Sequence, residues 1–102
     1  MSRTLEEDVK NYQSLVSAHE FFEKHCQTEE ERINAAHIRE RLRNAKYAVL
    51  SVSNLEAQQA LWIRYIEGKT PMYGAYVMNC SRRTFYRRLS KGFEEIRNMS
   101  QM

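Results

Sequence analysis

The sequence predicts an all-α protein, with an antiparallel helical hairpin followed by a three-helix unit. The chain of 102 residues contains only three glycines and one proline. Strand-like alternation of apolar and polar residues appears nowhere over a useful length. The runs are rich in Ala, Leu, Glu, Arg and Gln, which favour helices. We therefore expect residues 1–52 to form the hairpin and residues 53–102 to form the second unit.

Capping boxes and apolar stripes predict the two helices of the hairpin. Thr4 with Glu7, and Thr28 with Glu31, have the spacing that starts a helix. The first helix can run to about residue 25. The second carries an apolar stripe made of Ala35, Ile38, Leu42, Ala45, Val49 and Val52. Two antiparallel helices joined near residues 26–29 would bury both stripes. A coiled-coil homodimer formed through one stripe is the alternative, and the sequence leaves both open.

Further start signals predict the three-helix unit. Ser53 with Glu56 forms a third capping box, for a helix that ends near Gly68. Apolar residues surround much of this helix, so we expect a brace buried on two sides. Thr70 and Pro71 then predict a short helix, with Thr70 as its N-cap and Pro71 at its first position.

Residues 81–97 are expected to form an amphipathic helix after a tight turn. Asn79 suits the turn because asparagine tolerates the left-handed conformation. The apolar side of the helix consists of Phe85, Leu89, Gly92, Phe93 and Ile96. Ser81 is a good N-cap, which leaves Arg82 and Arg83 in the first turn. The helix dipole disfavours cations there by roughly 0.3–1 kcal/mol each. A polyanion would explain these arginines, whereas helix stability does not.

A short helix, a tight turn and a second helix make a helix-turn-helix, whose second helix enters the major groove of DNA. We expect Arg83 and Arg87 to contact guanine edges, and Arg82, Tyr86 and Arg88 to contact phosphates. The alternatives are an ordinary solvated face and, for Tyr86, a place at the edge of the core. The expected DNA-binding residues are Ser81, Arg82, Arg83, Thr84, Tyr86, Arg87, Arg88, Ser90 and Lys91.

Charge is distributed unevenly along the chain. Residues 1–31 carry −5, residues 32–53 carry +4 and residues 81–102 carry +4, within a net charge of +3. Such asymmetry predicts different partners for the two ends. A basic strip on the second helix consists of Arg32, Arg39, Arg43 and Lys46. For this strip, a solvated or internally paired face is favoured over a second DNA contact. The acidic residues Glu6, Glu7 and Asp8 could address RNA polymerase, although acids also stabilise a helix's first turn.

The sequence gives no sign of a cofactor, a metal site or an enzyme. His19, His25, Cys26 and His37 lack the helical spacing of metal ligands. A phosphate-binding glycine loop and a nucleophile elbow are both missing. Two cysteines are too few for a disulfide framework, and neither a signal peptide nor an apolar run of 18 residues is present. We therefore expect a reduced cytoplasmic protein that does not enter a membrane.

The segment from Leu55 to Asn98 resembles the region-four helix-turn-helix of bacterial sigma factors. The matching elements are the Arg64-Tyr65 pair, the turn Met78-Asn79-Cys80-Ser81, Arg82, and the closing Phe93 and Ile96. The form SRRTFYRRLSKGFEEI is similar to the ArpU/RinA-type phage transcriptional regulators, which carry a tyrosine- and arginine-rich second helix. Gly74 stands where the family usually has an apolar residue, and Asn79 where glycine is commonest. The first departure leaves the packing of the short helix open.

The resemblance implies a sequence-specific transcriptional regulator of phage or mobile-element type in a bacterial host cell. Double-stranded DNA is then the main expected partner, with RNA polymerase and a second protomer as further ones. Two other hypotheses stay open. The first is a small DNA-recognition subunit of a phage packaging (terminase) machine, which would form a ring of eight or more protomers. The second is a sigma-like module that binds RNA polymerase and never DNA.

Overall fold

A computed structural model describes residues 4–100, and for Ser100 only the backbone. The helices of this part are α1 (Leu5–Lys10), α2 (Tyr12–His25), α3 (Glu29–Leu50), α4 (Leu55–Leu61), a π-helical turn η1 (Trp62–Ile66), α5 (Pro71–Val77) and α6 (Arg82–Ser100). No strand occurs within residues 4–100, so the predicted all-α class is confirmed. The extreme ends of the two expected segments, residues 1–3 and 101–102, lie outside the described residues.

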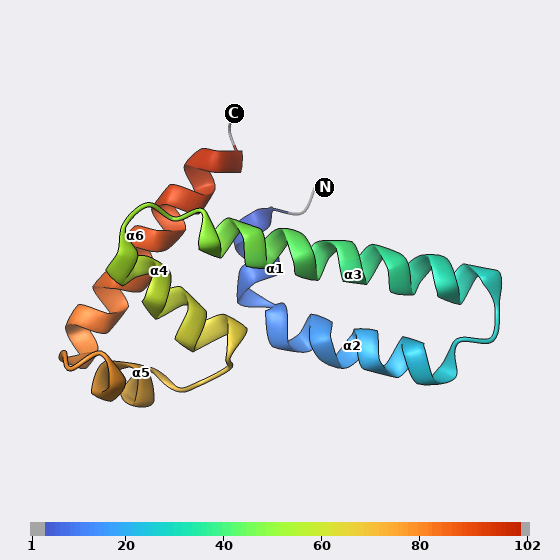
Figure 1. Ribbon diagram of the computed structural model, residues 1–102, viewed down its shortest axis with the longest axis horizontal. Helices are drawn as coiled ribbons and strands as arrows, with labels where there is room; N and C mark the ends of the chain where they lie inside the picture. The colour runs from blue at the N-terminus through green and yellow to red at the C-terminus, as the bar shows by residue number, and fades with distance from the viewer. Residues whose placement is uncertain (1–3, 101–102) are drawn as a thin grey trace.

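The helices form an elongated molecule of about 48 × 32 × 20 Å. α2 and α3 run antiparallel along one arm, which confirms the predicted packed pair (Figure 1). α4, η1, α5 and α6 form the other end, with α6 packed against α4 and α5. α1 lies where the two parts meet and contacts both α3 and α6. None of the described helices is long and apolar enough to cross a membrane.

Three predicted N-caps are present as hydrogen bonds. The hydroxyl oxygen of Thr4 accepts from the Glu7 amide at 3.1 Å. The Thr28 hydroxyl accepts from the Glu31 amide at 3.1 Å and donates to the Glu31 carboxylate at 2.9 Å. Thr70 accepts from the Tyr73 amide at 3.1 Å, and Pro71 begins the helix. These side chains satisfy amide groups that the start of a helix leaves without partners.

The prediction of one continuous first helix to about residue 25 is wrong. The helix is interrupted at Asn11, where α1 ends and α2 begins. Asparagine is a weak helix former, so it provides a site where the direction can change at low cost. The change serves packing, because α1 lies against α3 and α6 whereas α2 lies against α3 and η1.

The third capping box is also misplaced by one residue. Asn54, not Ser53, is the N-cap of α4, and its side-chain oxygen accepts from the Ala57 amide at 2.9 Å. Ser53 is held instead by Glu95, whose carboxylate accepts from its hydroxyl at 2.6 Å and from its amide at 2.9 Å. A partner 42 residues away in the chain therefore overrides the local capping signal.

The helix that begins at Leu55 ends near Gly68, as expected, but its last turn widens into η1. Gly68 follows with φ of +74°, a left-handed conformation that glycine adopts without strain. The side-chain amide of Gln13 donates to the carbonyl oxygens of Tyr65 at 3.1 Å and Ile66 at 2.7 Å. This side chain satisfies carbonyl groups at the end of η1 and ties it to α2.

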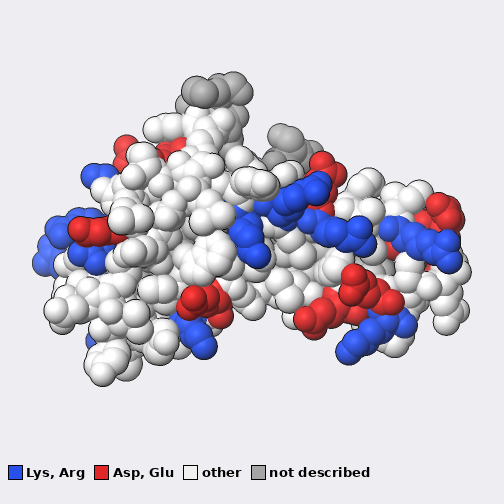
Figure 2. Space-filling view, in the orientation of Figure 1, with Lys and Arg blue, Asp and Glu red and all other residues white. Residues whose placement is uncertain are grey.

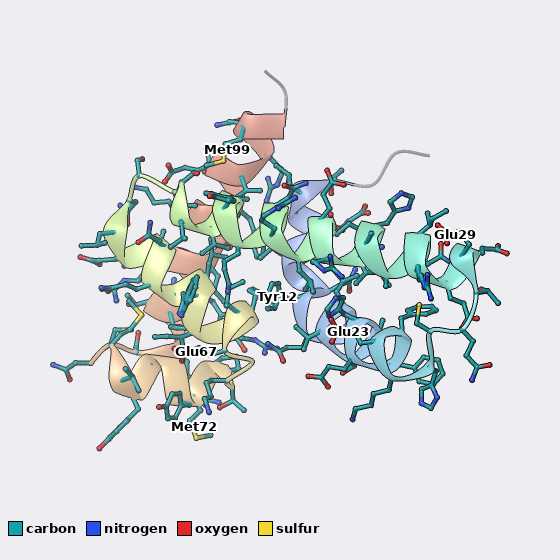
Figure 3. The ribbon with its side chains drawn as sticks, turned by 45° about the vertical axis from the view of Figure 1, so that its right-hand side comes forward. Tyr12, Glu23, Glu29, Glu67, Met72 and Met99 are labelled. Carbon is teal, nitrogen blue, oxygen red and sulfur yellow. The ribbon has the colours of Figure 1, made fainter. Side chains whose placement is uncertain are left out.

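One apolar core joins the two ends of the molecule. Val9 and Tyr12 from the N-terminal helices belong to the same cluster as Leu61, Phe85 and Ile96. Tyr12 lies at the centre, between the N-terminal helices and the α4–η1 segment (Figure 3). Leu61, Phe85 and Ile96 are fully buried. The apolar side of α6 is therefore fixed in the body of the protein.

Candidate nucleic-acid interface

The connection between α5 and α6 is a tight turn centred on Asn79. Asn79 has φ of +54°, in the left-handed region. The Asn79 amide donates to the Tyr76 carbonyl at 3.1 Å, and the Cys80 amide donates to the Ala75 carbonyl at 2.9 Å. These bonds form a Schellman motif, which ends a helix and reverses the chain direction. Asparagine replaces the commoner glycine here because its short polar side chain tolerates this conformation.

A close contact between α5 and α6 explains the glycine at position 74. Gly74 is buried, and a Cβ atom built on it would lie 2.4 Å from the Phe85 ring. The aromatic ring thus fills the space that an apolar side chain would otherwise occupy. Ala75 is also buried beside it. The short helix is therefore packed tightly against α6 in spite of its departure from the sigma-factor pattern.

Ser81 begins α6 as predicted. Its hydroxyl oxygen accepts from the Thr84 amide at 3.1 Å and its hydroxyl group donates to the Thr84 side-chain oxygen at 3.0 Å. Arg82 and Arg83 are therefore the first two residues of the helix, at the positive end of its dipole. The Ser81 and Thr84 hydroxyls are occupied with each other, which leaves the arginines as the strongest hydrogen-bond donors of this turn.

The side of α6 opposite the core is open to solvent. The exposed members of the predicted set are Ser81, Arg82, Arg83, Tyr86, Arg87, Ser90 and Lys91. No salt bridge or hydrogen bond is formed by the guanidinium groups of Arg83 and Arg87 within residues 4–100. These two arginines stand one helical turn apart on the same side. Figure 2 shows Lys and Arg gathered at the end of the molecule that α6 forms. The helix therefore offers paired, unneutralised cations to a ligand.

Arg88 differs from the other arginines of the set. Its Nη2 atom lies 2.7 Å from a carboxylate oxygen of Glu56, and its side chain is 22% exposed. The pair joins α6 to α4. The sequence gives no local signal for this contact, because 32 positions separate the partners.

The middle and end of α6 are anchored through two carboxylates. Glu95 accepts hydrogen bonds from the Ser53 hydroxyl and amide, and from the Asn54 amide at 3.3 Å. The Ser53 hydroxyl, above all, lowers the pKa of Glu95 from its ordinary value. Arg97 Nε lies 2.7 Å from a Glu6 oxygen. Partial burial raises the pKa of Glu6, but hydrogen bonds from Lys10 and Arg97 outweigh it, so the pKa is lowered.

The acidic residues of α1 have internal partners. Glu6 bonds Lys10 and Arg97 at 3.0 and 2.7 Å, and the buried Asp8 lies 3.0 Å from Arg41. Glu7 supplies an amide to the Thr4 cap. Two of the three carboxylates that were considered for a polymerase contact therefore hold the fold together.

Sequence reasoning overlooked Tyr76, which is 84% exposed on α5 directly before the turn. Its exposure follows from the tertiary packing of Gly74 and Ala75 on α6, which the sequence of a two-turn helix shows only weakly. Among residues 4–100, no three His, Cys, Asp or Glu side chains come together in a group that could hold a metal. Searches against protein-family models, curated proteins and solved structures find no match to this chain.

Proposed function

We propose that the protein is a sequence-specific DNA-binding transcriptional regulator of phage or mobile-element type. In this proposal α5 and α6 act as a helix-turn-helix, and α6 enters the major groove. One observation carries the proposal. Arg83 and Arg87 are exposed and unneutralised, one turn apart, on a helix whose opposite side is fixed in the core.

The chemistry of these side chains fits the edges of base pairs. A major groove about 12 Å wide admits an α-helix, whose N-terminal residues approach the bases. A guanidinium group can donate two parallel hydrogen bonds to guanine O6 and N7. We assign this role to Arg83 and Arg87. Arg82, Tyr86 and Lys91 are placed to contact phosphates, which position the protein without specifying sequence. Tyr76 on α5 adds a phenol next to the turn.

Arg88 is proposed to act inside the protein. Its ion pair with Glu56 would have to break before the guanidinium could bind a phosphate. We therefore assign Arg88 to fixing α6 on α4, so that the open side of the helix keeps its orientation.

The proposal is tested on a DNA sequence selected from a random pool. The double variant Arg83→Lys/Arg87→Lys keeps the charge but loses the bidentate geometry. It should retain most affinity for unrelated DNA and lose preference for the selected site, by about 1–3 kcal/mol for each lost guanine contact. Equal affinity of wild type for all sequences would refute specific recognition.

Arg82→Ala is the matched control on the same helix turn. Loss of a phosphate contact should weaken binding to all sequences about equally and reduce the salt slope by about one. The selected site should remain preferred. A loss of preference in this variant, with none in the lysine double variant, would contradict the assignment of roles.

A second candidate function, the sigma-like polymerase-binding module, is favoured by one observation. An apolar groove beside α5 is lined by Leu50, Trp62, Ile63, Tyr73, Val77 and Met78, with Gln58, Gln59 and Glu67 among them. A pure protein-binding module would show no binding to duplex DNA that weakens with salt. Several phosphate contacts should instead reduce affinity about 10³–10⁵-fold between 50 and 200 mM salt.

A further inference from the structure

A row of cations runs along α3, on the arm away from α6. Its members are Arg32, Arg39, Arg43 and Lys46, and all four are exposed. On a helix these positions share one side, and at 1.5 Å per residue the row is about 21 Å long. Figure 2 shows Lys and Arg side chains following α3 along the visible face. The row is thus a straight line of positive charge on a rigid element.

The charges of this row are hardly compensated within the protein. In the described part of the chain, Arg39 and Arg43 form no salt bridge, and Arg32 has only Glu29 at 4.0 Å. Lys46 lies over the Trp62 ring, 5.7 Å from its centroid, and keeps its charge. Arg41 shows what compensation looks like on the same helix, since it is paired with Asp8 at 3.0 Å. The internal acids are therefore directed to other cations.

Folding does not require such a row. Like charges three or four residues apart on a helix destabilise it slightly. Tyr47, which is 64% exposed, lies with Arg43, Lys46 and Leu50 around a shallow hollow at the end of the row. A phenol beside cations adds a hydrogen-bond donor for an anionic oxygen. The side chains of this surface thus share a preference for closely spaced anions.

Duplex DNA fits this surface better than an acidic protein does. Protein interfaces have an apolar centre, yet between Arg32 and Lys46 the row contains only Ala36 as an apolar member. A DNA strand presents a phosphate about every 3.4 Å of helix axis, so several phosphates can face a row of this length. The chemistry required is a regular line of phosphates.

We propose that the α3 row, Arg32 to Lys46, is a second binding surface for the phosphate backbone of duplex DNA. This inference rests on the proposed DNA-binding function and adds a contact that does not depend on sequence. The backbone can belong to the DNA that flanks the site of α6, or to a second duplex. In either case the row increases affinity and leaves sequence preference unchanged.

The test neutralises three members of the row. Arg39→Gln/Arg43→Gln/Lys46→Gln should lower the slope of log affinity against log salt by about 2.7, at about 0.9 for each phosphate contact. Between 50 and 200 mM salt, the variant should therefore lose about 40-fold less affinity than wild type. Fluorescence anisotropy with the selected duplex measures both. The matched variant Arg39→Lys/Arg43→Lys/Lys46→Arg keeps every charge and should bind as wild type does.

Duplex length separates the two sources of phosphate. Flanking contacts predict a difference between wild type and the glutamine variant on about three helical turns of DNA, and none on about one turn. A second duplex predicts that wild type, unlike the variant, captures two differently labelled short duplexes together. An unchanged salt slope in the glutamine variant on every duplex, together with no loss of such co-capture, overturns the inference.

Two further measurements keep the test clear. Circular dichroism checks folding, and if the triple variant is unfolded, Arg43→Gln alone should still lower the slope by about 0.9. Lys24→Gln removes one exposed charge from α2 and should leave the slope as in wild type. If wild type shows no sequence preference but the row variant still lowers the slope, the specific regulator fails and the α3 surface stands.

Discussion

At the scale of single residues, the fit between Gly74 and Phe85 decides how closely α5 lies against α6. Alanine normally stabilises a helix relative to glycine by roughly 0.5–1 kcal/mol. At position 74 the added methyl group would meet a fully buried aromatic ring at 2.4 Å. Gly74→Ala should therefore destabilise the protein, by about 1–3 kcal/mol, as overpacked cores do. Denaturant unfolding followed by circular dichroism measures the change.

Gly92 provides the matched comparison within α6. A Cβ atom there would meet the end of the Leu61 side chain at 2.5 Å. A leucine side chain can rotate away more easily than a buried ring, so Gly92→Ala should cost less than Gly74→Ala. A Gly74→Ala protein as stable as wild type would show that the two helices are not in this close contact.

At the scale of elements, α6 is held by carboxylates whose charge depends on pH. The pKa of Glu95 is lowered from its ordinary value of 4.5 by hydrogen bonds from the Ser53 hydroxyl and backbone. A lowered pKa means that the stabilisation is fully present above about pH 4.5 and is lost as pH falls through the folded-state pKa. Thermal unfolding between pH 7 and pH 3 should show this loss, with Glu6 contributing in the same direction.

Glu95→Gln isolates the effect of one carboxylate. The variant should be less stable than wild type at neutral pH and should approach it at acidic pH, because wild type then loses the charged acceptor. Glu94→Gln, at an exposed neighbouring position, is the control and should follow wild type. A stability difference in Glu95→Gln that is equal at every pH would assign the effect to packing.

Local chemistry explains which elements could be predicted from the sequence. Thr28, Thr70 and Ser81 start their helices because each side chain bonds an amide three residues ahead. Asn79 marks its turn in the same local way. The apolar side of α6 was predicted correctly, since helical periodicity alone places Phe85 and its neighbours on one side.

The rest depends on contacts between distant parts of the chain. The break at Asn11, the shift from Ser53 to Asn54 and the π-helical turn η1 all follow from what each segment packs against. The same holds for the candidate interface. The sequence predicts a cationic side of α6, but only the fold separates the open Arg83 and Arg87 from Arg88 with its partner Glu56.

At the scale of the whole molecule, the shared core predicts one cooperative unfolding unit. Val9 from α1 is fully buried in the same cluster as the apolar side of α6. Val9→Ala should therefore lower the stability of the entire chain, by about 1–3 kcal/mol. Far-UV circular dichroism and the fluorescence of Trp62, the single tryptophan, should shift together. Val77→Ala, at a half-exposed position of α5, is the control. Two separate transitions would contradict a common core.

The same architecture assigns two binding surfaces to one rigid molecule. α6 supplies arginines for base edges, and the α3 row supplies cations for phosphates. The core and the Arg97–Glu6 pair connect the elements that carry them. Mutations on α6 should change which DNA is bound, whereas mutations on α3 should change how strongly any DNA is bound.

The central claim is that the open side of α6 lies in the major groove, and methylation of guanine N7 by dimethyl sulfate tests it most directly. N7 is a major-groove atom and an acceptor for arginine. On a selected duplex, wild type should protect guanines within the site, and Arg83→Lys/Arg87→Lys should leave them reactive. Unchanged guanine N7 reactivity in the presence of bound wild-type protein would contradict the claim.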